Sequence, residues 1–168
     1  MNFNSKLDET VISYVRSALP LLRKFDPTSE IAVEQNVIHP NLYYFGRFDA
    51  IIRYKDTFFL IDFKTNDSSS MKLGNDVGHF YSGPLQIAAY IGAVNCLPAY
   101  SSLSTVKTGA IVNVKEDGSE ADFNEISFSK LEEFWFIWLK RVQRFWYELS
   151  NRPMRDGSVS FLYDGKKK

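Results

Sequence analysis

The apolar run from Thr57 to Phe63 carries a carboxylate near its end and is followed at once by a lysine. Its β-branched and aromatic residues are typical of a β-strand. Because the side chains of a strand alternate between its two faces, Asp62 and Lys64 point to the same side. The chain is therefore expected to form a sheet that holds an acid and an amine next to each other.

A second strand-like run, Tyr43 to Tyr54, comes directly before the first. The break between them, Lys55-Asp56, is short enough to be a hairpin turn. The segment Gly46-Arg47-Phe48-Asp49 lies near the start of this run, so the hairpin pairing brings Asp49 close to Asp62. Two acids and one amine are thus predicted to converge on one patch.

The remaining elements follow from hydrophobic periodicity and from turn and capping signals. Helices are predicted at Leu7 to Leu22, from Pro84 to about Val94 and at Ser129 to Leu149, and further strands at Ile31 to Ile38, Val106 to Val114 and Phe123 to Phe128. The segment Ser5 to Asp8 and the pair Ser129 and Glu132 are predicted capping boxes. This order predicts an α/β chain of the mixed α+β type, with a central mixed β-sheet flanked by helices.

A chain of 168 residues has the usual size of one domain. The predicted domain covers residues 1–150, and an irregular basic tail covers residues 151–168. The polar segment Thr65 to Gly83 directly follows the acid and the lysine, and it is predicted to be a long loop of the kind that is often functional. No window of about 18 apolar residues occurs, so no membrane span is expected, and a monomer is assumed.

The composition restricts the kind of site that the chain can build. Twenty Lys and Arg balance twenty Asp and Glu, so the formal net charge is zero and any contact with nucleic acid must come from a local patch. One cysteine and two histidines are too few for a thiolate or imidazole metal site. A metal in this protein must therefore be a hard ion held by carboxylates.

Hydrolysis of a phosphodiester needs the residues that the hairpin is predicted to bring together. Carboxylates such as Asp49 and Asp62 hold Mg²⁺ or Mn²⁺, which polarises the phosphate and lowers the pKa of a bound water. Lys64 would orient that water or offset charge. The backbone carbonyl of Phe63 is a further hard oxygen ligand for the metal.

Three motifs follow one another along the chain: Gly46-x-x-Asp49, Asp62-x-Lys64-Thr65 and Gln86-x-x-x-Tyr90. Gln86 and Tyr90 share one face of a predicted helix, where an amide and a phenol can position a phosphate or a nucleotide. In this order and at these separations, the motifs resemble the RecB-type branch of the PD-(D/E)xK nucleases. The segments Tyr44 to Asp49, Ile61 to Thr65 and Pro84 to Asn95 resemble in particular the mitochondrial exonucleases of that branch.

The resemblance covers most of the chain and implies a restriction-endonuclease-like core. It implies an exonuclease that threads single-stranded DNA, needs Mg²⁺ or Mn²⁺ and processes mitochondrial DNA. A mitochondrial location is also implied, although Met1 to Glu9 lacks the Arg-rich, acid-poor character of a transit peptide.

The resemblance also implies a role for each site residue. Asp49 and Asp62 would be metal ligands, Lys64 the catalytic lysine, and Gln86 and Tyr90 active-site support. On the preceding strand, Glu34 is either a further acid of the metal site or an outward-facing residue.

The chain departs from the family at one point. The family carries a metal-binding histidine on a helix well before the Gly-x-x-Asp motif, and this chain begins too late to contain it. His39 stands only ten residues before Asp49, at a strand end, and neither it nor His79 is assigned as a ligand. Two alternatives to an active exonuclease therefore stay open: an inactive nuclease-fold module that binds nucleic acid or protein, and an endonuclease of the same fold.

Other features of the sequence are interpreted structurally. The aromatic residues of the last helix have the spacing of a buried face and are expected in the core; they are Trp135, Trp138, Phe145 and Trp146. Cys96 is expected to be a small buried residue. On the other side of the last helix, Lys140, Arg141 and Arg144 either contact phosphates or form a solvated face, which is the default. The terminal run Lys166 to Lys168 receives no role.

Overall fold

The computed structural model describes residues 9–25, 32–66, 82–103 and 105–152, and a five-stranded sheet in the order β1-β2-β3-β4-β5 forms its centre. The strands are β1 (Ala32–Ile38), β2 (Phe45–Tyr54), β3 (Thr57–Asn66), β4 (Thr108–Lys115) and β5 (Asp122–Ile126). Neighbouring strands are antiparallel, except that β3 and β4 are parallel. The mixed sheet predicted from the sequence is therefore confirmed.

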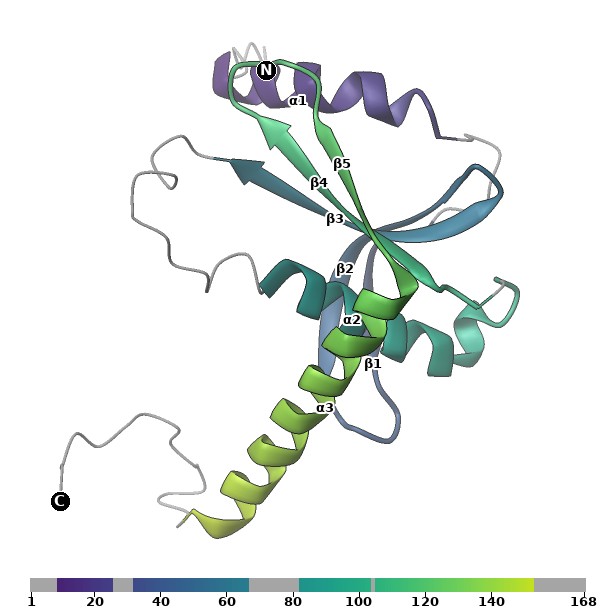
Figure 1. Ribbon diagram of the computed structural model, residues 1–168, viewed down its shortest axis with the longest axis vertical. Coiled ribbons are helices and arrows are strands. Elements are labelled where there is room, and N and C mark those ends of the chain that lie inside the picture. The colour runs from purple at the N-terminus through teal and green to yellow at the C-terminus, as the bar shows by residue number, and fades with distance from the viewer. Residues whose placement is uncertain (1–8, 26–31, 67–81, 104, 153–168) are drawn as a thin grey trace, which may run out of the picture.

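Helices flank the sheet, as predicted (Figure 1). In the described part of the chain they are α1 (Glu9–Leu22), α2 (Ser82–Cys96) and α3 (Phe128–Asn151), with a short 3₁₀ turn, η2 (Pro98–Tyr100). α1 packs on one face of the sheet, α2 on the other, and α3 packs mainly against α2. Because parallel strands need a crossover connection, α2 lies on the path from β3 to β4. None of the helices in the described ranges is long and apolar enough to cross a bilayer.

The sheet separates two apolar cores. The core on the α2 side includes the fully buried Phe48, Ile51, Leu60 and Ile87. The core on the α1 side includes Leu21, Ala50, Ile52, Phe59, Ile61 and Val112. β2 and β3 contribute side chains to both cores, which explains why their sequences are nearly continuous apolar runs instead of alternating ones.

The β2–β3 hairpin has the predicted two-residue turn. Lys55 and Asp56 have φ angles of 47° and 60°, and Tyr54 pairs with Thr57 across the turn. Positive φ at both central positions is the signature of a type I′ turn, whose twist matches that of the flanking strands. The turn fixes the register of the two strands that carry the predicted acids.

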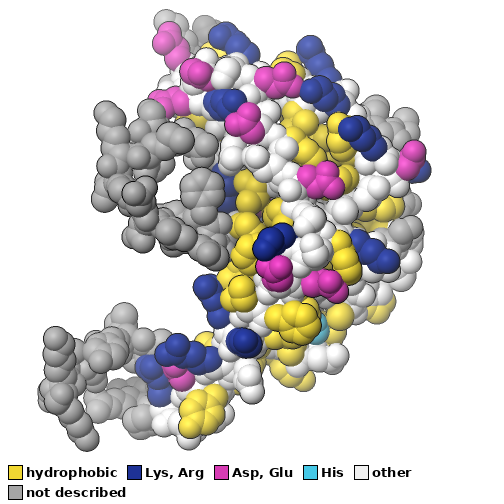
Figure 2. All heavy atoms as spheres, viewed as in Figure 1, with side chains coloured by type: hydrophobic (Ala, Val, Ile, Leu, Met, Phe, Trp, Pro, Cys, Tyr) yellow, Lys and Arg dark blue, Asp and Glu magenta, His cyan; other side chains and the backbone are white. Residues whose placement is uncertain are grey.

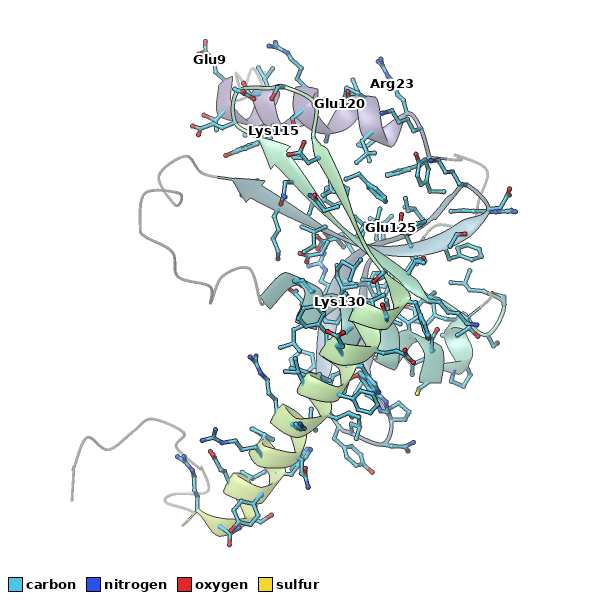
Figure 3. All side chains as sticks on the ribbon, viewed as in Figure 1. Glu9, Arg23, Lys115, Glu120, Glu125 and Lys130 are labelled. Carbon is cyan, nitrogen blue, oxygen red and sulfur yellow. The ribbon has the colours of Figure 1, made fainter. Side chains whose placement is uncertain are left out.

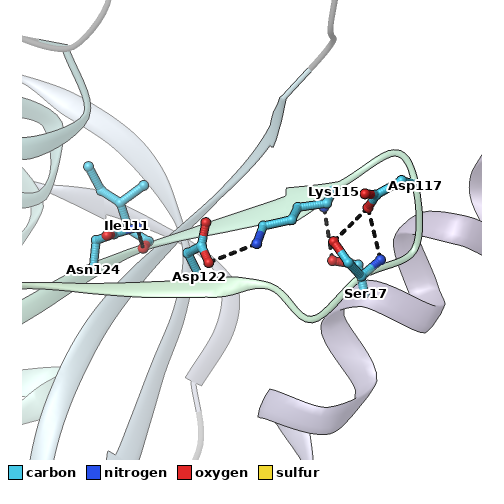
Figure 4. A network of polar contacts seen from close by, with 7 residues as sticks. Ser17, Ile111, Lys115, Asp117, Asp122 and Asn124 are labelled. Carbon is cyan, nitrogen blue, oxygen red and sulfur yellow. Dashed lines mark hydrogen bonds and ion pairs between the residues drawn. The ribbon is translucent and has the colours of Figure 1, made fainter.

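Polar contacts fix α1 to the β4–β5 hairpin. The buried Ser17 accepts a hydrogen bond through its Oγ from the backbone N–H of Lys115 at 2.9 Å (Figure 4). Its carbonyl accepts a second hydrogen bond from the N–H of Ala121 at 3.0 Å. Lys24 and Glu120 add an exposed ion pair of 2.7 Å, and Figure 3 shows Glu120 on the hairpin beside α1. α1 therefore braces the edge of the sheet that lies away from β1.

The structure corrects several predicted boundaries around α3 and β3. Ser127 is the N-cap of α3 and accepts a hydrogen bond from the N–H of Lys130, so the predicted capping box at Ser129 and Glu132 is wrong. The strand predicted to reach Phe128 ends at Ile126, because the chain turns into the helix there. β3 extends beyond Phe63, since its pairing with β4 continues to Asn66.

Smaller differences occur at other element ends. β2 begins at Phe45 and not at Tyr43, whose φ of 55° is incompatible with a strand. α2 begins two residues before Pro84, which is tolerated because the first-turn N–H groups of a helix need no partner within it. β4 begins two residues later than predicted, at Thr108, and ends at Lys115.

Some predictions fall outside the described residues. They are the capping box at residues 5–8, the first residue of the predicted strand 31–38, most of the loop 65–83 with His79, and the tail beyond Arg152. The division into a domain over residues 1–150 and a tail stays a prediction, although Asn151 is the last residue of α3.

Two predictions about burial are corrected. Cys96 is exposed, because it is the last residue of α2. The aromatic residues of α3 form core only in part: Trp135 and Trp138 pack against the α2 side of the fold, whereas Phe145 and Trp146 are 43% and 38% exposed. The C-terminal half of α3 extends past the sheet and past α2 (Figure 1), so little of the fold is available to cover it.

Candidate active site

The candidate site lies where β2 and β3 separate. Their ladder runs from Tyr54 and Thr57 to Ala50 and Ile61, and beyond that pair β2 continues along β1 while β3 continues along β4. Asp49 and Asp62 are the first residues beyond the last pair, one on each strand. The structure thus places the two acids at opposing positions, as the hairpin predicts.

The carboxylate of Asp49 ends the hairpin ladder. Its Oδ2 accepts a hydrogen bond of 2.7 Å from the backbone N–H of Phe63, which would otherwise need a partner from β2. This contact holds the side chain of Asp49 against β3 and fixes its position relative to Asp62.

Asp62 is a buried acid, with 3% of its surface exposed. Burial raises its pKa, and the nearby charge of Asp49 raises it further, while the ion pair with Lys64 acts in the opposite direction. Its Oδ2 lies 2.7 Å from Lys64 Nζ but accepts no hydrogen bond of good geometry from a described residue. Lys64 therefore meets this oxygen as a nearby charge more than as an aligned donor.

A chain of polar contacts runs from Lys64 to α2. Lys64 Nζ donates to Gln86 Oε1 at 3.4 Å, and Gln86 Nε2 donates to the hydroxyl of Tyr90 at 2.9 Å. Gln86 and Tyr90 are one helical turn apart and face the end of β3 together. The structure thus brings the five predicted site residues into one continuous arrangement.

Gly46 allows β2 to approach this arrangement closely. A β-carbon at this position would overlap the ring of Tyr90. Next to it, the hydroxyl of Tyr44 donates a 2.7 Å hydrogen bond to the carbonyl of Ala89, and burial raises the pKa of Tyr44, so the phenol stays protonated. The sequence motif contains Gly46 but gives no sign that its role is contact with Tyr90, because that contact joins a strand to a helix 44 residues away.

Substitution Gly46→Ala is expected to destabilise the fold by about 1–3 kcal/mol, because the added methyl group overpacks against the Tyr90 ring. Urea denaturation of the variant and of the wild type measures this loss. If the clash with Tyr90 is the cause, Tyr90→Leu should relieve part of it, so the double variant should lose less than the sum of the single losses. Strictly additive losses would contradict this explanation.

Glu34 and His39 do not join the two acids. The carboxylate of Glu34 is exposed and forms an ion pair with Arg47. The buried His39 accepts hydrogen bonds at Nδ1 from the N–H groups of Asn41 and Leu42, at 3.3 and 3.2 Å, so it stabilises the turn after β1. Within the described residues, no group of three or more His, Cys, Asp and Glu side chains gathers around a common point.

The donor set fits a hard divalent cation. Asp49 and Asp62 supply carboxylate oxygens, the ligand type that Mg²⁺ and Mn²⁺ prefer. The buried Oδ2 of Asp62 lies 2.7 Å from the ammonium group of Lys64, so a cation bound here would share this oxygen with Lys64 or displace it. The mixed sheet thus presents two acids and a lysine where two strands part, which is a candidate site for a metal ion.

Comparison with known proteins shows to which proteins the chain is related. It is 33% identical to "Mitochondrial genome maintenance exonuclease 1" of Mus musculus over 114 residues, which are 68% of this chain and 32% of the relative. The identity is 29% over 155 residues with the protein of that name from Homo sapiens, covering 91% of this chain and 43% of the relative. The chain is therefore related to mitochondrial genome maintenance exonuclease 1, as the motifs predict, and it spans less than half the length of these relatives.

Other comparisons complete this result. The Xenopus tropicalis protein of the same name is 32% identical over 114 residues, covering 68% of this chain and 31% of the relative. No protein-family model matches the chain. Among solved structures, the crystal structure of SSO0001 aligns with a TM-score of 0.40 and 18% identity, over 82% of this chain and 59% of that chain.

Proposed function

We propose that this chain is a metal-dependent nuclease domain that hydrolyses phosphodiester bonds of single-stranded DNA from its ends. The observation that carries the proposal is the meeting of Asp49, Asp62 and Lys64 where β2 and β3 part. The relationship to proteins named as exonucleases supports the same chemistry. Those names also support a role in maintaining mitochondrial DNA and a mitochondrial location for this chain.

Asp49 and Asp62 would hold Mg²⁺ or Mn²⁺, and the carbonyl of Phe63, on the same strand as Asp62, would be a further hard oxygen ligand. When bound, such an ion supplies Lewis-acid polarisation of the phosphate and a more acidic water. Asp62 contributes its charge from a buried position, where interactions between charges are screened less than in water.

Lys64 presents its ammonium group on the same face as Asp62. Its side chain is 40% exposed, so it can reach a phosphate while remaining beside the acid. There it would donate to a phosphate oxygen and offset the negative charge that develops during hydrolysis. Gln86 holds Lys64 through its amide oxygen, and Tyr90 holds Gln86, so both act as positioning residues.

End-labelled single-stranded DNA should be degraded by the purified chain in Mg²⁺ or Mn²⁺, and EDTA should stop the reaction. Lys64→Ala should lower the rate by about 10²- to 10⁴-fold, as is typical when a group that assists proton transfer or charge development is removed. Gel electrophoresis of the products measures both effects. A matched control is Lys107→Ala, an exposed lysine at the opposite end of β4 from the site.

The experiment also separates the alternatives. An endonuclease of the same fold would cut circular single-stranded DNA, which an exonuclease leaves intact. An inactive binding module would be folded but would cleave neither substrate. Two observations favour it: Asp62 is paired with Lys64, and no third acid of the described residues gathers with Asp49 and Asp62. Cleavage that Lys64→Ala leaves unchanged would refute the proposed site.

A further inference from the structure

One face of α3 carries exposed aromatic and basic side chains, with the basic residues lying between two aromatic ones. We call it the outer stripe; its residues are Phe136, Ile137, Lys140, Arg141, Arg144 and Tyr147. Phe136, Lys140, Arg144 and Tyr147 follow one another at intervals of four, four and three residues, which places them along one side of a helix. The buried residues of α3, Leu131 and Val142, lie on the opposite side.

The aromatic side chains of the outer stripe are unusually open to solvent. Phe136 is 63% exposed and Tyr147 is 70% exposed. An ordinary solvated helix face carries polar and charged residues, so two large aromatic rings among cations need a further explanation. Aromatic rings combined with cations are a common means by which proteins bind single-stranded nucleic acids, because bases stack on the rings and phosphates meet the cations.

The outer stripe is also a local concentration of positive charge. The segment 136–152 contains four basic residues, Lys140, Arg141, Arg144 and Arg152, and one acid, Glu148, which gives a net charge of +3 in a chain whose formal net charge is 0. Figure 2 shows Lys and Arg side chains gathered over this part of the molecule. Arg144 is paired with Glu148, whereas no ion pair joins Lys140 or Arg141 to another described residue. These two cations are suited to meet phosphates.

The stripe is held in a fixed relation to the candidate site. Trp146, on the inner side of α3, donates a hydrogen bond from Nε1 to the carbonyl of Leu42 at 3.1 Å and packs edge-to-face on Tyr43. These residues belong to the turn that leads into β2, whose Gly46 contacts Tyr90. At the other end of the helix, Trp135 packs on α2 at Gly92, and α2 also carries Gln86. A strand bound to the stripe would therefore keep a defined position relative to the site.

We propose that the outer stripe of α3 binds the single-stranded part of a nucleic acid substrate whose end reaches the candidate active site. The inference rests on the proposed function, since it names the surface that holds the strand during cleavage. Phe136 and Tyr147 stack on bases, and Lys140 and Arg141 bind the phosphates between them. Eleven residues of helix separate the two rings, about 16 Å at 1.5 Å per residue, which is the length of about five stacked nucleotides at 3.4 Å each.

Fluorescence anisotropy tests the inference without cleavage. It measures, in EDTA, the binding of a 5′-fluorescein-labelled oligothymidylate of about twenty nucleotides. Phe136→Ala and Tyr147→Ala should each weaken binding by about 5- to 150-fold, the usual effect of losing one stacked base. Lys140→Gln and Arg141→Gln should each reduce the slope of log Kd against log salt concentration by about 0.7. All four side chains are exposed, so thermal unfolding of these variants should match that of the wild type.

Matched controls lie outside the stripe. Phe128→Ala removes a 51% exposed aromatic residue from the first turn of the same helix, and Lys107→Gln removes an exposed lysine near the opposite end of the sheet. Both should bind the oligonucleotide as the wild type does. Stripe variants that bind within twofold of the wild type, or controls that lose as much affinity as the stripe variants, would overturn the inference. If the stripe variants lose affinity but the wild type cleaves no DNA, the proposed function fails and the binding surface stands.

Discussion

Replacing Asp62 by asparagine should remove cleavage and at the same time stabilise the folded chain. In the proposed function Asp62 holds the metal, and such a carboxylate supplies several kcal/mol of transition-state stabilisation, so the rate should fall by about 10²- to 10³-fold or more. Burial raises the pKa of Asp62, which means that the charged carboxylate is held in the fold at a cost that Lys64 does not fully offset. Asparagine has the same shape without the charge. The free energy of unfolding is therefore expected to increase by about 0.5–2 kcal/mol.

The gain in stability from Asp62→Asn should be larger at neutral pH than at acidic pH. Because the folded-state pKa of Asp62 lies above its unfolded value, the folded chain binds more protons than the unfolded chain between the two values. The contribution of Asp62 to wild-type stability therefore falls as the pH rises through that interval, and the loss is complete above the folded-state pKa. The stability difference between Asp62→Asn and the wild type should be largest near neutral pH and should shrink on acidification.

Urea denaturation in EDTA at several pH values measures this difference, and the nuclease assay with Mg²⁺ measures the rate. Lys64 keeps 40% of its side chain exposed, so water can solvate its ammonium group once the carboxylate is removed. A variant that is less stable than the wild type at neutral pH would show that the ion pair outweighs the burial of Asp62. A stabilised variant that still cleaves DNA would instead show that Asp62 is not needed for catalysis.

The hairpin and its acids could be predicted from local sequence alone. A two-residue turn between two apolar runs determines the register of the strands, and the register places Asp49 opposite Asp62. Alternation within one strand then adds Lys64 to the same face. Each of these steps uses residues that are close in sequence, so no knowledge of the tertiary fold is needed.

The contacts with α2 and the surroundings of Glu34 could not be predicted in this way. Lys64 meets Gln86 only because the crossover from β3 to β4 lays α2 beside the end of β3, and the order of the motifs suggested this without giving the contact. Glu34 is near Asp49 in the sheet, but its φ of 53° and its exposed pairing with Arg47 direct its carboxylate elsewhere. Both outcomes depend on backbone geometry that residue types do not encode.

The last helix shows a different limit of sequence reasoning. The apolar spacing of α3 correctly indicates which side faces the fold, since Leu131 and Val142 are buried. It does not indicate how far the covering surface extends, and so Phe145 and Trp146, at the end that passes α2, are partly exposed. Periodicity defines the direction of a face, whereas its burial depends on the size of the neighbouring elements.

The strand that carries Asp49 depends on its neighbour Phe48, and Phe48→Ala should destabilise the fold by about 3–5 kcal/mol. Phe48 is fully buried in the core on the α2 side and packs edge-to-face on Tyr100, with ring centres 6.0 Å apart. Truncation removes the transfer free energy of the ring and leaves a cavity that a close-packed core cannot fill. Since domains are typically stable by only about 5–15 kcal/mol, much of the stability of the chain would be lost.

A matched control for Phe48→Ala lies three residues earlier on the same strand. Phe45 is 82% exposed, so Phe45→Ala truncates a ring that lies in solvent and not in a core. The free energy of unfolding should therefore change by no more than about 0.5 kcal/mol. Urea denaturation of both variants at one pH gives the two losses directly. The ring of Phe48 anchors β2 beside the position where β2 separates from β3. The stability lost in Phe48→Ala should therefore also lower nuclease activity at temperatures where the wild type is folded. Equal losses at the two positions would mean that the core on the α2 side is not packed around Phe48.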